Sequence, residues 1–325
     1  MKNNLPLVSF ITPTYNRKEL LEKAILSVIH QKQNIPFERE MIIVDDWSKD
    51  WTEFFIQKYL DKYQDNIKYF YQENGGVGKA RNLWLDNMSK NSDYLIFLDS
   101  DDELIDDCIY TCLKKRQELR ERWEYENIVW LFYFCKTQYG KLIWTKNILW
   151  WKKEIYITYH DFLQNKIKFE FWILCKSIYF LENTTFRFPE DVITETILSS
   201  KMHKYFNEHW LKCIIMDYIG RIYTIWHWIQ ITKTISPERF KKNAIGNERI
   251  LEIIQNDLLL FWYKNSYWEY LFRAWINWFL YGDRIKWINY LKKSLKYQKN
   301  IRNVVIYLLS LLNRNIVLFI YKLYI

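Results

Sequence analysis

Three aspartates stand directly after an apolar run, residues 94–98, that is typical of a buried strand. They are Asp99, Asp101 and Asp102, with Ser100 between the first two. Carboxylates at positions i and i+2 behind a strand can converge on one divalent cation, Mg²⁺ or Mn²⁺, which prefers oxygen ligands and leaves room for substrate phosphate. The alternative is structural: Asp102 or Ser100 is the N-cap of the helix that follows.

Two more polar clusters follow apolar runs earlier in the chain. Residues 12–17 follow the run 7–11, and residues 45–50 follow the run 41–44. Strand patterns alternate here with helix patterns, which predicts an α/β fold with a mostly parallel sheet and helices on both faces. Because ligands bind beyond the carboxyl ends of such strands, the clusters predict one shared site.

The patterns predict further elements along the chain. We expect strands at 7–11, 41–44, 67–71, 94–98, 128–134 and 141–145, and helices at 18–31, 51–63, 79–88 and 104–123. Ser236 as N-cap and Pro237 as first helical residue mark a boundary, after which the pattern is helical to the end.

Tryptophan is unusually frequent and glycine unusually rare. The chain has 17 Trp and 7 Gly, and their combined share, about 7%, is usual for glycine alone. Trp47 and Trp51 stand in a polar turn where glycine, which reaches positive φ at little cost, would be expected. We interpret Trp47, Trp51, Trp84 and others as glycines of the source organism, encoded by UGA and translated as Trp. The alternative is a truly Trp-rich chain, with Trp47 stacking on a nucleobase.

The positive charge is concentrated near the end of the chain. The net charge is +9, and residues 283–325 contain nine Lys or Arg and one Asp. Lys and Arg followed by aromatic and aliphatic residues suit peripheral contact of 284–325 with a membrane, whereas packing on the core is the alternative. No RNA-binding motif accompanies the charge, so we expect no nucleic-acid partner.

The five cysteines and the N-terminus favour a cytoplasmic protein. The cysteine count is odd and contains no C-x-x-C pair, which favours reduced thiols. The first residues do not form a signal peptide, and the apolar stretch 304–325 is interrupted by polar residues. Together with the basic tail, this predicts a cytoplasmic location at the inner face of the cell membrane.

Five segments resemble, in order and spacing, the motifs of family 2 glycosyltransferases with the GT-A fold. They are residues 11–17, 44–52, 74–82, 97–102 and 188–192. The resemblance covers roughly residues 5–195. It implies a GT-A catalytic domain at 1–235, with a nucleotide-sugar half at 1–102 and an acceptor half at 103–235, and a helical region at 236–325.

The resemblance also implies a function. The expected activity is a metal-dependent, inverting transfer of a sugar from a nucleotide sugar, most simply a UDP-sugar, to a hydroxyl of a surface glycan or lipid-linked acceptor. The alternative is a catalytically impaired nucleotide-sugar-binding protein of the same fold, because Trp at 47, 51 and 84 departs from the family's glycines.

The resemblance assigns roles residue by residue. The expected nucleotide-binding residues are Pro13, Tyr15, Asn16, Arg17, Asp45, Asp46, Gly76, Arg81, Asp99 and Ser100. The expected ligands of Mg²⁺ or Mn²⁺ are Asp99, Asp101 and His227, although a surface or core histidine is the alternative for the last. Asp191 is the expected catalytic base. Glu190 would raise the pKa of Asp191 or contact the acceptor, and the structural alternative is an N-cap for a helix at 192–202.

Overall fold

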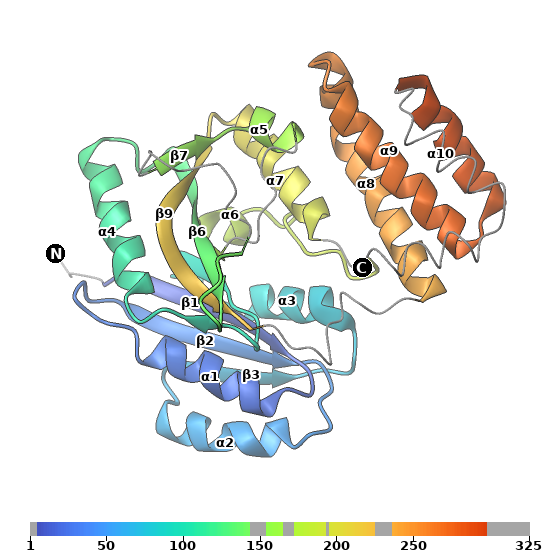
Figure 1. The fold of residues 1–325 in the computed structure, drawn as a ribbon. Coiled ribbons are helices and arrows are strands. Elements are labelled where there is room, and N and C mark those ends of the chain that lie inside the picture. Colours follow the sequence, from blue (N-terminus) through green and yellow to red (C-terminus); the bar gives the residue numbers. More distant parts are fainter. Residues whose placement is uncertain (1–4, 144–153, 165–171, 193–194, 225–235, 298–325) are drawn as a thin grey trace. The chain divides into compact units, whose positions relative to one another are not determined.

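The computed structural model describes residues 5–143, 154–164, 172–192, 195–224 and 236–297 (Figure 1). The chain divides into two compact units. Unit 1 contains Met1–Thr158, Ile167–Glu190 and Tyr205–Ile225, and unit 2 contains Tyr159–Lys166, Asp191–Lys204 and Trp226–Ile325. The expected functional division at residue 235 stays a prediction.

Unit 1 is built on one mixed sheet. The strand order is β3-β2-β1-β4-β8-β6-β9-β5, with β7 paired to β9. The strands are β1 Leu7–Thr14, β2 Glu38–Asp45, β3 Ile67–Tyr71, β4 Tyr94–Phe97, β5 Glu103–Leu104, β6 Ile128–Thr137, β7 Glu154–Ile157, β8 Trp172–Lys176 and β9 Lys212–Tyr223. The first four are parallel, and β8 runs antiparallel to both β4 and β6. The expected mostly parallel sheet is confirmed.

Helices cover both faces of the sheet (Figure 1). The helices of unit 1 are α1 Lys18–Ile29, α2 Thr52–Lys62, α3 Gly76–Asn87, α4 Cys108–Glu121 and α6 Ile178–Leu181. Buried residues of α1, α2 and α4 share one core with Phe10, Met41 and Ile96 of the sheet. On the opposite face, Trp84 of α3 lies against Phe97. Burial on both faces explains why these strands read as continuous apolar runs.

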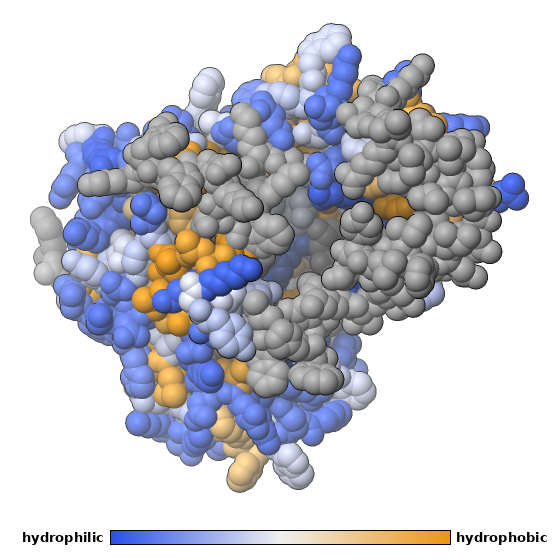
Figure 2. Space-filling model, viewed as in Figure 1, coloured by the Kyte–Doolittle hydropathy of each residue, from blue (hydrophilic) through white to orange (hydrophobic). Residues whose placement is uncertain are grey.

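Unit 2 is helical. Its elements are α5 Tyr159–Leu163, most of α7 Thr196–Glu208, α8 Pro237–Leu260, α9 Lys264–Tyr281 and α10 Arg284–Tyr297. The predicted start of α8 is confirmed, because Ser236 accepts a hydrogen bond from the Arg239 N–H and Pro237 is the first helical residue. Within the described residues, no helix has the length and apolar character needed to cross a membrane. Figure 2 shows hydrophilic residues over much of the visible described surface, with apolar residues in separate patches.

Three predictions about elements were wrong. The predicted helix at 104–123 begins only at Cys108, since Glu103 and Leu104 form β5 against β9. The described part of the predicted strand 141–145 contains a single β-bridge at Leu142. The helix expected at 192–202 begins at Thr196, so Asp191 is not its N-cap.

Candidate functional site

The sheet register brings the ends of three strands together. Thr14 of β1 pairs with Asp45 of β2, and Ile11 of β1 pairs with Phe97 of β4. The segments that follow β1, β2 and β4 are therefore neighbours at one edge of the sheet. The predicted meeting of the three polar clusters is confirmed by the hydrogen bonds between their residues described below.

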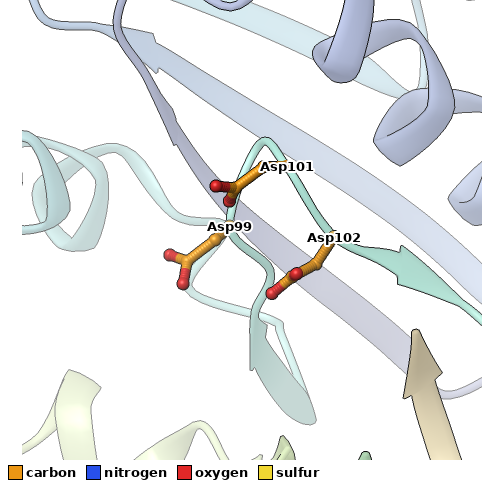
Figure 3. Close-up of side chains that lie close together, drawn as sticks. All are labelled: Asp99, Asp101 and Asp102. Atoms are coloured by element: carbon orange, nitrogen blue, oxygen red, sulfur yellow. The ribbon is translucent and has the colours of Figure 1, made fainter. Parts of the chain in front are cut away.

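Asp99, Asp101 and Asp102 form a compact acidic cluster in the turn between β4 and β5 (Figure 3). One carboxylate oxygen from each lies within 4.8 Å of the others. The alternative of a capping role for Asp102 or Ser100 was wrong, because α4 begins at Cys108 with Asp107 as its N-cap. Asp102, which sequence reasoning did not assign to the metal, thus joins the two expected carboxylates.

Each carboxylate of the cluster is paired with an arginine from a different element. The pairs are Asp101–Arg17 at 2.6 Å, Asp99–Arg81 at 2.8 Å and Asp102–Arg221 at 3.2 Å. Arg17 precedes α1, Arg81 lies in α3 and Arg221 lies in β9. Three arginines therefore face three buried or half-buried carboxyl groups, whose negative charges would otherwise be costly to bury.

The three carboxyl groups have shifted pKa values. Burial is the main cause that raises the pKa of Asp102 to about 8, and Asp99 and Asp101 add to it while Arg221 opposes it. Burial and the charge of Asp99 also raise the pKa of Asp101. For Asp99, burial is outweighed by Arg81 and the other arginines, so its pKa is lowered. Two of the three carboxyl groups therefore have raised pKa values, as expected where burial and neighbouring carboxylates disfavour the charged form.

The residues after β1 are tied to the loop after β2. The Asn16 N–H donates to Ser48 Oγ at 2.8 Å, and the Lys49 N–H donates to Asn16 Oδ1 at 2.6 Å. Asn16 adopts a left-handed backbone, φ 51°, which asparagine tolerates better than most residues. Tyr15 beside it is exposed. These contacts hold two of the expected nucleotide-binding segments in a fixed arrangement.

Asp45 and Asp46, both expected at the nucleotide, are buried. Asp45 accepts hydrogen bonds from the Tyr69 hydroxyl and the Ser48 N–H, each at 2.8 Å. Asp46 accepts from the N–H groups of Gly75 and Gly76, at 2.7 and 2.8 Å, and from Gln72 Nε2 at 2.8 Å. Asp46 therefore anchors the start of α3, where Gly76 adopts a φ of +83°. Their contact with a nucleotide stays a prediction.

Asn82 fastens the 188–190 segment to α3. Its Nδ2 donates to the Phe188 carbonyl and to Glu190 Oε1, each at 2.9 Å, and its Oδ1 accepts from the Phe188 N–H at 2.8 Å. Gly78 allows this approach, because a Cβ there would lie 2.2 Å from the Pro189 carbonyl oxygen. Asn82 lies in the motif at 74–82, but the sequence alone indicated no role for it.

Asp191 lies in unit 2, where it forms a two-bonded ion pair with Arg249 of α8. The hydrogen bonds from Arg249 are the main cause that lowers the pKa of Asp191. One of the two roles expected for Glu190 was to raise the pKa of Asp191. This prediction was wrong, because the hydrogen bonds from Arg249 lower that pKa. The other expected role, contact with the acceptor, stays a prediction. Arg249 lies 58 residues along the chain, and no motif pointed to it.

The remaining candidates are located as follows. Pro13 is half-buried and Ser100 is buried, both near strand ends. His227 lies outside the described residues, so its expected role at the metal stays a prediction. Of the basic tail, the structure describes α10 up to Tyr297, and residues 298–325 lie outside the described part.

The family model described as Glycosyl transferase family 2 matches residues 9–173, which is half of the chain. The chain belongs to this family. Among curated proteins it is 28% identical over 257 residues to the GalNAc(5)-diNAcBac-PP-undecaprenol β-1,3-glucosyltransferase of Campylobacter jejuni, covering 78% of this chain and 76% of that protein. It is 42% identical over 103 residues to the putative teichuronic acid biosynthesis glycosyltransferase TuaG of Bacillus subtilis, covering 32% of this chain and 39% of that protein.

Solved structures confirm the predicted GT-A fold class. S. aureus TarS 1–349 in complex with UDP-GlcNAc is similar with a TM-score of 0.62 and 20% identity, covering 89% of this chain and 81% of that chain. The mannosyltransferase PcManGT of Pyrobaculum calidifontis, in complex with GDP-Man and Mn²⁺, is similar with a TM-score of 0.53 and 13% identity, covering 98% and 84%. At these identities the likeness concerns the fold.

Proposed function

We propose that this family 2 glycosyltransferase is a metal-dependent inverting enzyme that transfers a sugar from a UDP-sugar to a hydroxyl group. The observation that carries the proposal is the meeting of three carboxylate oxygens within 4.8 Å at the carboxyl edge of the sheet. This is the edge where open α/β sheets bind ligands.

The donor set of the acidic cluster suits a hard divalent cation. All three groups are carboxylates, and Asp102 Oδ2 is buried, paired with Arg221, and accepts no hydrogen bond from the described residues. Asp99, Asp101 and Asp102 would hold Mg²⁺ or Mn²⁺, as oxygen-rich sites do. When bound, the cation would neutralise the charge that develops on the leaving diphosphate. In this proposal His227 is a further ligand.

The residues around the cluster are suited to a nucleoside diphosphate. Exposed Tyr15 and half-buried Pro13 offer apolar surface for a base, while Arg17 and Arg81 bring guanidinium groups to the acidic cluster. Guanidinium groups bind phosphate oxygens in a two-bonded geometry. On donor binding, these arginines would contact the diphosphate. The proposed nucleotide set also includes Asn16, Asp45, Asp46, Gly76, Asp99 and Ser100.

Asp191 is the proposed base. Its lowered pKa keeps the carboxylate ionised at neutral pH, as a group must be to accept the proton of an attacking hydroxyl. Arg249 holds both oxygens in one orientation. Glu190, bonded to Asn82 in unit 1, is proposed to contact the acceptor.

The proposed acceptor is a surface glycan or lipid-linked glycan. The name of the C. jejuni relative specifies an undecaprenol-linked acceptor, and the TuaG name refers to teichuronic acid biosynthesis. A basic α10, with five Lys or Arg and no Asp or Glu, would suit peripheral contact of 284–325 with an anionic membrane surface. We accordingly propose action at the cytoplasmic face of the membrane, with a catalytic region at 1–235 and a membrane-facing region at 236–325.

The test is UDP release from a panel of UDP-sugars, with and without EDTA. We expect turnover that EDTA abolishes and Mn²⁺ restores. Asp101→Asn should lower turnover by about 100-fold or more, as loss of an electrostatic group at a transition state does. Asp61→Asn, the same change at an exposed site on α2, should leave it unchanged. Full turnover in EDTA would reject metal dependence. Donor binding without any turnover would favour the alternative of a catalytically impaired binding protein.

A further inference from the structure

Left-handed backbone is concentrated at tryptophan in this chain. Among the described residues, six that are not glycine have a positive φ, and five of the six are Trp. The sixth is Asn16, a residue type that tolerates this region. Positive φ is uncommon outside glycine and is a genuine outlier for a bulky residue. The five are Trp47 at φ 75°, Trp51 at 67°, Trp123 at 60°, Trp210 at 58° and Trp262 at 59°.

Three of these tryptophans end helices in the same motif. In each, the Trp is the second residue after the helix and the next N–H bonds back across the helix end. The bonds are Glu124 N to Leu119 O at 2.9 Å, Leu211 N to Phe206 O at 2.8 Å and Tyr263 N to Leu258 O at 2.8 Å. The Trp N–H groups complete the pattern, bonding to Arg120 O, Asn207 O and Leu259 O. This is the Schellman motif, whose left-handed residue is usually glycine.

A fourth helix end supplies an internal comparison. The residue after α9 is Gly282, the C-cap, which has a φ of 108° and whose N–H bonds to the Trp278 carbonyl. Among the helix ends that the structure describes, glycine thus stands at one left-handed position and Trp at three others. The side chains at those three ends are 93%, 86% and 74% exposed for Trp123, Trp210 and Trp262, so their indoles gain little by burial.

Two tryptophans of α9, Trp275 and Trp278, are buried instead. Trp278 is 2% exposed, its Nε1 donates to Glu248 at 2.7 Å, and Lys286 lies 3.9 Å from its ring centre. Trp275 is 1% exposed and packs in the same helical unit. These two and the five at positive φ therefore differ in what the structure requires of them. The indoles of Trp275 and Trp278 are buried in the helical unit, whereas the five positions at positive φ require only a left-handed backbone.

We propose that positions 47, 51, 123, 210 and 262 are glycine in the working protein. The codon UGA is read as different amino acids in different genetic codes, so one decoding choice would account for all five positions. Trp84 falls outside this argument, because it is buried in the middle of α3 and carries no positive φ. The proposal thus adds three helix ends to the two turn positions that the sequence pointed to.

Position 47 also bears on the site. It follows Asp45 and Asp46 in the loop after β2, where Trp47 is 44% exposed with Lys49 Nζ 4.4 Å from its ring centre. This part rests on the proposed function: glycine at 47 would remove the indole from the loop that carries Asp45 and Asp46, and so leave more room there for a nucleoside.

Peptide mass spectrometry of the protein from its source organism tests the assignment directly. Peptides spanning 123, 210 and 262 should contain glycine. Peptides spanning 275 and 278 show which residue stands at these two buried positions. Tryptophan at 123, 210 and 262 would overturn the proposal. Codons reading UGG at these positions would overturn it equally.

Thermal unfolding of recombinant protein gives a second, independent test. The triple variant Trp123→Gly, Trp210→Gly, Trp262→Gly should raise the Tm by roughly 5 °C, because three strained residues are relieved. The matched control Trp278→Gly should lower it. A lower Tm for the triple variant would contradict the assignment. Trp47→Gly should tighten UDP binding at least about tenfold. If native peptides carry glycine but UDP fails to bind, the proposed function fails while the glycine assignment stands.

Discussion

The carboxylate of Asp46 is expected to be a main support of the loop that begins α3, and Asp46→Asn tests this. Asp46 is buried and accepts three hydrogen bonds, two of them from the consecutive N–H groups of Gly75 and Gly76. The substitution keeps the size of the side chain but replaces one acceptor oxygen by an NH₂ group. One N–H in the loop then faces a donor instead of an acceptor.

The expected cost follows from these contacts. A hydrogen bond to a charged group contributes about 1.5–3 kcal/mol, and a neutral one about 0.5–1.5 kcal/mol. The variant loses one charged bond and weakens the other two, so we expect the free energy of unfolding to fall by about 3 kcal/mol. The loss of an anion near the N-terminus of α3 adds a few tenths of a kcal/mol to this.

Urea unfolding, followed by tryptophan fluorescence, measures the change, and amide hydrogen exchange locates it. Exchange should accelerate at residues 74–78 more than elsewhere. The control is Asp61→Asn, since Asp61 bonds to Gln57 on an exposed helix surface, where surface changes cost under about 0.5 kcal/mol. A loss below about 1 kcal/mol for Asp46→Asn, or uniform exchange changes, would refute the anchoring role.

Three further predictions follow from single contacts. Burial lowers the pKa of His203 from 6.5 to about 4; a lowered folded-state pKa means that stability is full above pH 6.5 and falls toward pH 4. The free energy of unfolding should fall by about 3 kcal/mol over this range. Urea unfolding at several pH values measures this fall, and the substitution His203→Gln should abolish it. Arg249→Gln should raise the pKa of Asp191 and move the acidic limb of the pH–rate profile to higher pH. If the limb does not move, Asp191 is not the catalytic base. Gly78→Ala should destabilise by about 1–3 kcal/mol, since its Cβ meets the Pro189 carbonyl; unchanged urea midpoints would contradict that contact.

Sequence patterns were sufficient to predict those elements whose structure depends on residues close together in the chain. The strand at 67–71 was predicted with its observed bounds, because a run rich in β-branched and aromatic residues between polar turns needs no distant partner to be recognised. The start of α8 was also found, since Ser236 and Pro237 act within one helical turn. In contrast, Leu104 was predicted as helix although it lies in β5, because the strand is held by residues of β9 more than 100 positions away.

The same distinction explains what was missed in the site. Asp99 and Asp101 were found from their spacing behind a strand, whereas Asp102 was given no metal role and was considered only as an alternative cap, because its partner Arg221 lies far along the chain. Asn82 stood in a motif, but its role depends on Phe188 and Glu190, which reach it only in the folded chain. A sequence motif indicates which residues belong to the site, but their partners are seen only in the tertiary structure.

The charge balance of the cluster constrains how the proposed donor would bind. Three carboxylates face three arginines, so the cluster as a whole attracts a lone cation weakly. A divalent cation bound to a diphosphate is close to neutral, and its phosphate oxygens can take the guanidinium groups while its cation takes the carboxylates. Each charged group then exchanges one partner of opposite sign for another, and no buried charge is left unpaired. Under the proposed function, the cluster is therefore built to bind the cation and the diphosphate together.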